Sequence, residues 1–337
     1  MHWGAVNARA RGLATHLLDR ESLLLAAGAQ TWPAAARILL ERGYPVREGG
    51  ARLTPQELDC AVGGVLAERL ALLARWLGTG RSALAILSEE AEYRALRRLL
   101  RGAAQGISPG ARLRGVIPTS GLSEPVLSRL AHAESPARLI DMLIRLGHPA
   151  GRALQAAEAE TGSPPLWRLE KALARVYAMR SARAARHAGR AVRRFAAVAV
   201  DLLNAEALLL RSEWGPDVSP DEVFLPGGLV LDHARFTEAA GLDGDRIEAM
   251  MAKWFAGSPL AEVFGDAGPS RSFEARALGA LLDWQQREGR RDPLGPGVVL
   301  EVVARLRAEA HDVRLVSSAV ELGAPAGAVA AELVTPA

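Results

Sequence analysis

Residues 195–211 read FAAVAVDLLNAEALLLR, an apolar run that is interrupted by an acid at Asp201 and an amide at Asn204. Two similar runs carry an acid at Glu92 and at Glu309, which lie 109 positions before and 108 positions after Asp201. Because this spacing recurs through a chain of 337 residues, three copies of one unit fill its length. Such a unit is longer than the roughly 20–50 residues of solenoid repeats, so it can hold a small core of its own.

A second feature, a turn of the form Gly-x-Pro, recurs with the same period. It follows an apolar run with helical spacing and precedes the acid of its copy by about fifty positions. The loops after the first two acids also match, because each contains a Ser-Pro pair followed by a second glycine-containing turn. The third copy ends sooner, in a short closing helix through Val334. The turns are Gly43-Tyr44-Pro45, Gly147-His148-Pro149 and Gly257-Ser258-Pro259.

These repeats predict three similar lobes at about residues 1–120, 121–230 and 231–337. If the three copies fold alike, the three acids occupy equivalent places in their lobes and are related by a pseudo-threefold axis. Three lobes arranged around one axis enclose a central cavity. The expected shape is that of a holder for another molecule, not that of a catalyst.

Apolar residues recur at helical spacing along almost the whole chain, and the alternation typical of strands is scarce. Ala, Leu, Arg and Glu dominate the composition, which favours helix. We therefore expect an all-α protein of about fifteen helices. Between Pro165 and Pro216 the chain has no proline, and Gly189 is its weak point. We expect one helix there, which would reach about 70 Å at about 1.5 Å per residue.

Steps of three and four along this long helix place polar residues on one stripe. Asp201 and Asn204 lie there among apolar neighbours, where unpaired polar groups are costly, so we expect them to bond to an adjacent helix or lobe. The arginines of the stripe have two interpretations: they face a partner or the cavity, or they only solubilise the outside of a lobe. The stripe contains Arg183, Arg186, Arg190, Arg194, Asp201, Asn204 and Arg211.

The charge balance indicates little about partners. The formal net charge is only +3, and Lys171 and Lys253 are the only lysines among 41 basic residues, which is typical of a GC-rich genome. Without a localised patch that carries interleaved aromatic residues, such a chain is not expected to bind nucleic acid. Cys60 is the only cysteine, so an internal disulfide is excluded. We expect it to be a small core residue in a reducing compartment.

Membrane and catalytic signals are missing as well. The N-terminus lacks the apolar core of a signal peptide, and the longest apolar run is shorter than the about 20 residues of a membrane span. A P-loop, a dinucleotide-binding glycine motif and a His-Glu-x-x-His zinc motif are absent, and the seven histidines are scattered. We therefore expect no catalytic residue, no cofactor and no metal site.

In the order and spacing of its motifs the chain resembles the C subunit of prokaryotic A/V-type rotary ATPases, the counterpart of the eukaryotic vacuolar ATPase d subunit. The similarity extends over the whole length, from Asn7 to Val334. It rests on the Asp201-x-x-Asn204…Arg211 run and on the segments Phe224-Leu-Pro-Gly-Gly228 and Asp292-Pro-Leu-Gly-Pro-Gly297.

The resemblance implies a funnel of three helical lobes that sits on the membrane rotor ring and receives the foot of the central stalk. It implies a non-catalytic, peripheral subunit at the cytoplasmic face of the plasma membrane, which couples ATP hydrolysis or synthesis to proton or sodium transport. Its partners would be the stalk and ring subunits, with no nucleic acid, cofactor or small-molecule substrate. The alternative is a free-standing all-α scaffold that binds protein or nucleic acid through the arginine-rich helix.

Two lobes depart from the family's pattern. In the first lobe, Arg, Asp and Asn would stand near Glu90, Glu92 and Ala95, and only the acid is kept. In the third lobe, Asp312 stands where Asn is typical. We expect the following residues to contact partners or neighbouring lobes: Glu92, Asp201, Asn204, Arg211, Glu309, Asp312, Arg183, Arg186, Arg190 and Arg194.

Overall fold

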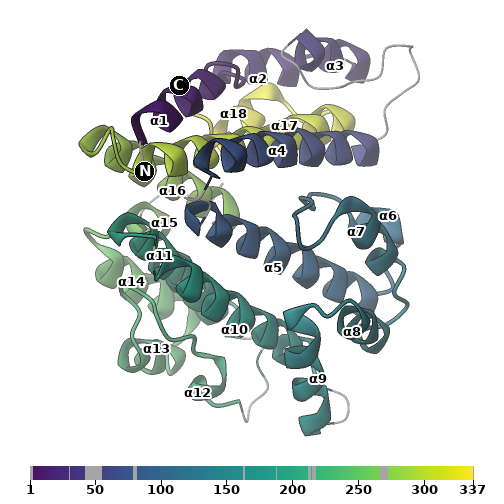
Figure 1. Ribbon diagram of the computed structural model, residues 1–337, viewed down its shortest axis with the longest axis vertical. Helices are drawn as coiled ribbons and strands as arrows, with labels where there is room; N and C mark the ends of the chain where they lie inside the picture. Colours follow the sequence, from purple (N-terminus) through teal and green to yellow (C-terminus); the bar gives the residue numbers. More distant parts are fainter. Residues whose placement is uncertain are drawn as a thin grey trace. The chain divides into compact units, whose positions relative to one another are not determined.

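The computed structural model describes residues 3–29, 31–41, 55–78, 82–161, 164–186, 188–211, 214, 218–265 and 272–336. Within these ranges it contains 18 α-helices and no β-strand (Figure 1). The all-α class expected from the sequence is therefore confirmed. The first Gly-x-Pro turn, at Gly43–Pro45, and the side chain of Cys60 lie outside the described residues.

The helices belong to two compact units, one made of both ends of the chain and one made of its middle. The first unit takes the described parts of residues 1–79 and 259–337. Its helices are α1 (Trp3–Ala14), α2 (Arg20–Ala27), α3 (Trp32–Glu41), α4 (Pro55–Leu77), α15 (Ala261–Phe264), α16 (Phe273–Arg291), α17 (Gly297–Leu322) and α18 (Ala326–Glu332).

Helix α17 is the centre of the first unit. It packs against α16, α4, α1 and α2, and its buried residues lie on all of its sides. A helix that is apolar all round is typical of a protein interior, because it leaves no face for water. Two acids, Glu309 and Asp312, are nevertheless buried in its middle.

The second unit takes residues 80–258. Its helices are α5 (Ser82–Ala104), α6 (Pro109–Arg112), α7 (Glu124–Ala131), α8 (Pro136–Arg145), α9 (Pro149–Thr161), α10 (Leu166–Ala185), α11 (Arg190–Leu209), α12 (Pro220–Val223), α13 (His233–Ala240) and α14 (Gly244–Phe255). Helix α10 lies beside α5, and it also packs against α9 and α11 (Figure 1). The stacked rings of Tyr93 and Tyr177, with centroids 5.3 Å apart, join α5 to α10.

The prediction of one long helix between Pro165 and Pro216 is wrong. Helix α10 ends at Ala185, α11 begins at Arg190, and the two helices pack against each other. Gly189 adopts a φ of 91° at the break, a conformation that glycine reaches without steric cost and that helices do not use. The arginine stripe is consequently divided between two helices.

The second and third Gly-x-Pro turns are where the sequence predicted them. Gly147 and Gly257 have φ of 65° and 73°, and each follows the end of a helix, α8 and α14 respectively. The division into lobes at 1–120, 121–230 and 231–337, their pseudo-threefold axis and the central cavity stay predictions. What the structure does supply is the set of contacts made by the three repeated acids.

Candidate functional site

The three repeated acids are buried in the middle of long helices. Glu92 on α5 is 6% exposed, Asp201 on α11 is 0% exposed and Glu309 on α17 is 2% exposed. A carboxylate in an apolar interior is costly unless hydrogen bonds or opposite charges compensate it. The hydrogen-bond and ion-pair partners of each acid therefore show which segment of the chain it stabilises.

Asp201 holds a run of three consecutive backbone N–H groups. Leu229 and Val230 each donate to Oδ2, at 2.8 and 2.9 Å, and Leu231 donates to Oδ1 at 2.9 Å. Gly228 lies so close that a Cβ there would be 2.3 Å from Oδ1 of Asp201. Burial raises the pKa of Asp201, although the three backbone hydrogen bonds act in the opposite direction.

Asn204, one helical turn further along α11, holds the beginning of the same segment. Its Nδ2 donates to the backbone oxygen of Leu225 at 2.8 Å, and its Oδ1 accepts from the N–H of Leu225 at 2.9 Å. One side-chain amide thus satisfies both polar groups of one residue. Together, Asp201 and Asn204 fasten residues 225–231 to α11.

Glu92 holds the corresponding segment with side chains instead of backbone groups. Thr119 donates its hydroxyl to Oε1 at 2.8 Å, and His148 Nε2 lies 3.3 Å from Oε2. Arg180 lies 3.8 Å from the same carboxylate. A Cβ at Gly121 would be 2.3 Å from Oε1. Burial raises the pKa of Glu92, but the hydrogen bonds from His148 and Thr119 and the nearby positive charges outweigh it, so the pKa lies below its ordinary value.

Glu309 holds a segment from the other end of the chain. The N–H of Leu18 donates to its Oε1 at 2.8 Å, and Arg69 on α4 pairs with its Oε2. Three residues further along α17, Asp312 accepts from the N–H groups of Val334 at 2.9 Å and Thr335 at 2.7 Å. Asp fits this position better than Asn would, because here both side-chain oxygens receive a donor.

The segments held by the three acids are built alike. Each leads, through a buried leucine and a capping residue, into a helix of eight residues. The leucines are Leu18, Leu122 and Leu231, the caps are Asp19, Ser123 and Asp232, and the helices are α2, α7 and α13.

The order of these contacts along the chain is cyclic. The acid of the first repeat holds the segment before α7, and the acid of the second holds the segment before α13. The acid of the third holds Leu18, before α2, near the beginning of the chain. We call these contacts the Glu92, Asp201 and Glu309 clasps. Each clasp fastens the segment before a short helix to the middle of a long helix.

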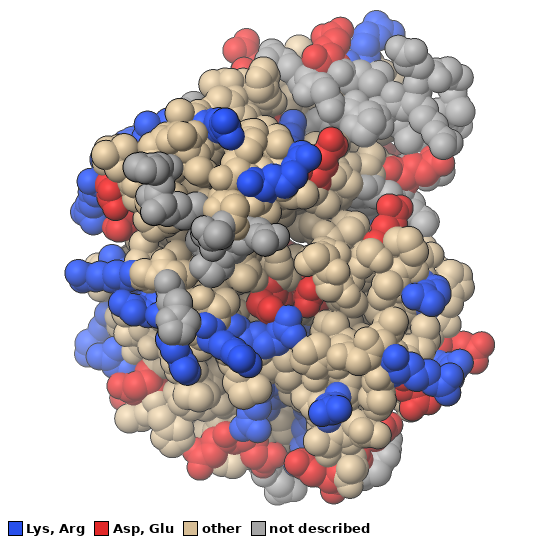
Figure 2. Space-filling model, viewed as in Figure 1, with Lys and Arg blue, Asp and Glu red and all other residues tan. Residues whose placement is uncertain are grey.

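Arg211 and the four arginines of the stripe lie elsewhere. Arg211 is half-buried, donates to the backbone oxygen of Ala240 at 3.2 Å, and covers the ring of Trp214 at 4.8 Å. Figure 2 shows Lys and Arg side chains gathered in the part of the view where Figure 1 draws α10 and α11. Of the stripe, Arg183, Arg186 and Arg190 are exposed, and Arg194 is half-buried.

The structure thus separates the ten residues singled out from the sequence into two groups. Six are bonded within the chain, namely the five buried residues and the half-buried Arg211, which lies just after α11. The other four, Arg183, Arg186, Arg190 and Arg194, lie at the end of α10 and the start of α11. Sequence reasoning missed the partners of the acids, chiefly Arg69, Thr119 and His148. The sequence could have pointed to Thr119, because this residue stands just before Gly121 in the loop that the first two repeats share. Nothing in the sequence pointed to Arg69, which lies 240 positions from Glu309.

Metal sites and membrane spans are two further classes of feature. In the described ranges, no group of three or more His, Cys, Asp or Glu side chains is arranged to hold a metal ion. No helix in that same part of the chain is both long and apolar enough to cross a membrane.

Comparison with known proteins identifies the family. Residues 6–330 match the family described as ATP synthase (C/AC39) subunit, and the chain belongs to this family. Two relatives, from two strains of Thermus thermophilus, are each named as the C subunit of a V-type ATP synthase. Both are 31% identical to this chain, over 333 and 335 residues, and each alignment covers 98% of both proteins. The resemblance drawn from the motifs is therefore confirmed.

Proposed function

We propose that this chain is a non-catalytic rotor subunit of a V/A-type ATPase or ATP synthase. It couples the central stalk to the membrane rotor ring, so that ATP hydrolysis or synthesis is linked to proton or sodium transport. The observation that carries the proposal is the family relationship over nearly the whole chain, with relatives named as C subunits of V-type ATP synthases. In this role, it works at the cytoplasmic face of the plasma membrane, held there by its partners.

The three clasps support a mechanical role. A protein that couples two rotor parts has to pass on torque without unfolding, and its repeats therefore need firm connections to one another. Each clasp is a buried, charge-assisted set of hydrogen bonds, a class of contact that is about twice as strong as a neutral hydrogen bond. Because the Glu309 clasp joins the third repeat to Leu18, even the start of the chain is fastened.

The arginine patch at the end of α10 and the start of α11 is the surface we propose for a partner. Arg183, Arg186 and Arg190 are exposed. Arg193, which lies next to Arg194 in the sequence, is exposed as well. Charged surfaces set the specificity and the rate of association more than raw affinity. The matching partner surface is acidic and belongs to the stalk or to the ring.

Affinity capture of the tagged chain from membranes of its source cell tests the proposed function. We expect stalk and ring proteins of one rotary complex to be recovered with it. Recovery of the chain alone on nucleic acid, with binding that weakens steeply as salt rises, would instead support the free-standing scaffold.

A quadruple charge reversal tests the patch separately. Changing Arg183, Arg186, Arg190 and Arg194 to Glu should abolish assembly and coupling while helix content and thermal melting stay nearly unchanged. The matched control reverses the same number of exposed arginines on α7, α8 and α9: Arg129, Arg138, Arg145 and Arg152. Normal assembly of the first variant at physiological salt, or equal loss in both variants, contradicts the assignment of the patch.

A further inference from the structure

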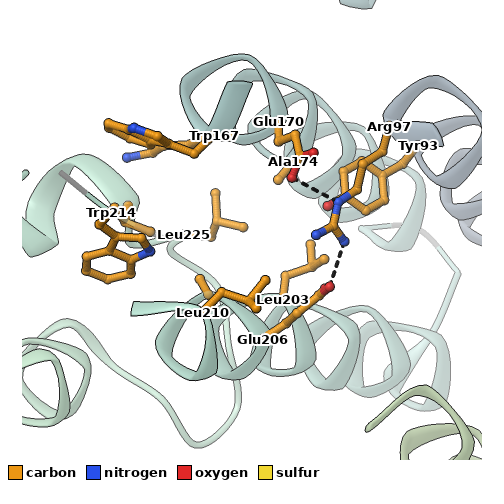
Figure 3. A pocket seen from close by; sticks show the side chains of 13 residues that line it. Tyr93, Arg97, Trp167, Glu170, Ala174, Leu203, Glu206, Leu210, Trp214 and Leu225 are labelled. Atoms are coloured by element: carbon orange, nitrogen blue, oxygen red, sulfur yellow. Dashed lines mark hydrogen bonds and ion pairs between the residues drawn. The ribbon is translucent and has the colours of Figure 1, made fainter. Parts of the chain in front are cut away.

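A small pocket opens in the second unit between α5, α10 and α11 and the segment that carries Val223 and Leu225 (Figure 3). Its volume is about 80 Å³, which is room for several water molecules or a small organic group. The wall is mostly apolar. In Figure 3, Trp167 and Trp214 line one side of the pocket, and Leu225 lies near its middle.

The opposite side of the pocket is closed by a neutralised ion-pair group. Arg97 donates to Glu170 at 3.1 Å and to Glu206 at 2.7 Å, as the dashed lines in Figure 3 show. Arg101 also donates to Glu170, at 2.8 Å, so that two arginines balance the two carboxylates. Burial raises the pKa of the adjacent Tyr93 to about 12, so its hydroxyl stays neutral. The two carboxylates on this side are therefore paired with arginine. They disfavour a second negative charge on any ligand.

Lys171 is the unsatisfied group of the pocket. Its Nζ is buried and has no hydrogen-bond partner among the described residues. Burial, helped by the positive charge of Arg175, lowers its pKa to about 7. A buried donor without an acceptor destabilises the fold, and an acceptor that reaches Nζ would relieve that cost.

The choice of lysine at this position is itself informative. Lys171 and Lys253 are the only lysines among 41 basic residues, so arginine replaces lysine nearly everywhere else. Arginine keeps its charge at any pH that a protein meets, whereas a buried lysine can release its proton when it has no counter-ion. A lysine can therefore line a pocket that is empty at one time and filled by an anion at another, because it can be neutral in the first state and charged in the second.

We propose that this pocket binds a carboxylate carried on a short apolar body, with the carboxylate on Nζ of Lys171 and the body between Trp167, Trp214 and Leu225. A carboxylate supplies both the acceptor and the counter-charge that Nζ lacks, and the apolar body matches the wall. A phosphate with two charges fits less well, because Glu170 and Glu206 face the same small space. The carboxylate comes either from a free short-chain acid or from an acidic side chain of a neighbouring protein.

Binding should weaken as the pH rises. The charged groups that act on Lys171 are Arg168 and Arg175 from its own helix and Asp221 and Glu222 from α12. In the empty pocket Lys171 is mostly charged at pH 6 and mostly neutral at pH 8, since its pKa is about 7. A carboxylate that binds the charged form should therefore bind about tenfold more weakly at pH 8 than at pH 6.

The test uses the two lysines as reporters in the full chain labelled with ¹³C at lysine. Lys253 on α14 is exposed and serves as the internal control. With sodium butyrate as the probe, we expect the ε-carbon signal of Lys171 to shift and its titration midpoint to rise, while the signal of Lys253 stays fixed. Butanol and inorganic phosphate at equal ionic strength should leave the Lys171 signal in place.

Two variants keep the test decisive. Lys171→Met should remove the ε-carbon signal of Lys171 and thereby assign it. Ala207→Leu should fill the pocket and abolish the shift caused by butyrate, while Lys171 still gives a signal. A Lys171 signal that butyrate does not move at pH 6, or that phosphate moves as much as butyrate, overturns the proposal.

The source of the carboxylate is decided in the complex captured with the chain. If Lys171→Met and excess butyrate each reduce the recovery of one partner protein, the pocket holds an acidic side chain of that partner. If recovery is unchanged while butyrate still shifts the signal, the ligand is a free acid. Failure of the capture itself counts against the proposed coupling function and leaves the butyrate experiment on the isolated chain valid.

Discussion

The Asp201 clasp and the Glu92 clasp do the same task with different chemistry. Asp201 binds only backbone N–H groups, and Glu92 binds the side chains of Thr119, His148 and Arg180. Backbone groups are present whatever the sequence, whereas side-chain partners can be lost by a single substitution. The pKa shifts follow the chemistry, because burial raises the pKa of Asp201 and side-chain partners lower that of Glu92.

This difference indicates where each clasp is vulnerable. The Asp201 clasp depends on close backbone approach, and Gly228 makes that approach possible. The Glu92 clasp depends on charges, and its strength therefore changes with pH. The Glu309 clasp combines the two, with one backbone donor at Leu18 and one cation at Arg69.

The largest effect is expected from Asp201→Ala. It removes the acceptor of three backbone N–H groups next to a buried helix, and each orphaned donor costs about 1–3 kcal/mol. We expect a loss of about 4 kcal/mol in the free energy of unfolding, measured by urea denaturation. Asp201→Asn, which keeps one acceptor oxygen, is the control and should lose less. A loss below about 1 kcal/mol for Asp201→Ala contradicts the role of this clasp.

A smaller effect is expected from Gly228→Ala. The new methyl group would stand 2.3 Å from Oδ1 of Asp201 and 3.0 Å from the backbone oxygen of Leu231, so the segment has to move. Overpacking of this kind costs about 1–3 kcal/mol. Gly121→Ala meets only the flexible end of Glu92 and should cost less. The comparison of the two clasps fails if thermal unfolding shows Gly121→Ala to be the more damaging change.

The loss of stability caused by Glu92→Gln should depend on pH. The pKa of Glu92 is lower in the folded chain than its ordinary value of 4.5, so its ionised form stabilises the fold above that pH. As the pH falls through the folded pKa, this contribution is lost. We expect Glu92→Gln to be about 2 kcal/mol less stable at pH 7, and the gap to the unchanged chain to close at acidic pH. A gap that is independent of pH between 7 and 3 contradicts the electrostatic account.

The smallest effect is expected from Thr119→Val, which keeps the shape and removes the hydroxyl. Thr119 donates to Glu92 and accepts from the N–H of Leu122 at 3.0 Å, and each such hydrogen bond contributes about 1 kcal/mol. A loss of about 1–2 kcal/mol in urea denaturation is expected. Thr15→Val, whose hydroxyl makes only a local exposed hydrogen bond, is the control and should change stability by less than about 0.5 kcal/mol.

The sequence was sufficient to predict the all-α class and the family, because helical spacing and repeated motifs are local features. It also predicted that Asp201 and Asn204 would need partners, since polar groups among apolar neighbours are costly. It could not identify those partners. Arg69 and Leu18 meet Glu309 only after the chain has folded, at separations of 240 and 291 positions.

The long helix was mispredicted for a physical reason. Helix propensity alone makes Gly189 only a weak helix residue. In the structure Gly189 has a positive φ, which glycine adopts without steric cost, and it lies at the break between α10 and α11. The folding-back of α11 against α10 gains packing that one straight helix would forgo. The pocket at Lys171 could not be predicted from the sequence either, because its walls come from α5, α10, α11 and the segment that carries Val223 and Leu225.

Amide hydrogen exchange at Leu18 tests the central claim, that the three buried acids hold the segments before α7, α13 and α2 in a cyclic order. Leu18 precedes α2 and its N–H takes no part in the hydrogen bonds of a helix, so Glu309 is its acceptor. The account predicts slow exchange at Leu18 in the unchanged chain and fast exchange in Glu309→Ala, while the amides of Leu229, Val230 and Leu231 stay protected. Fast exchange at Leu18 in the unchanged chain, or protection that survives Glu309→Ala, would contradict it.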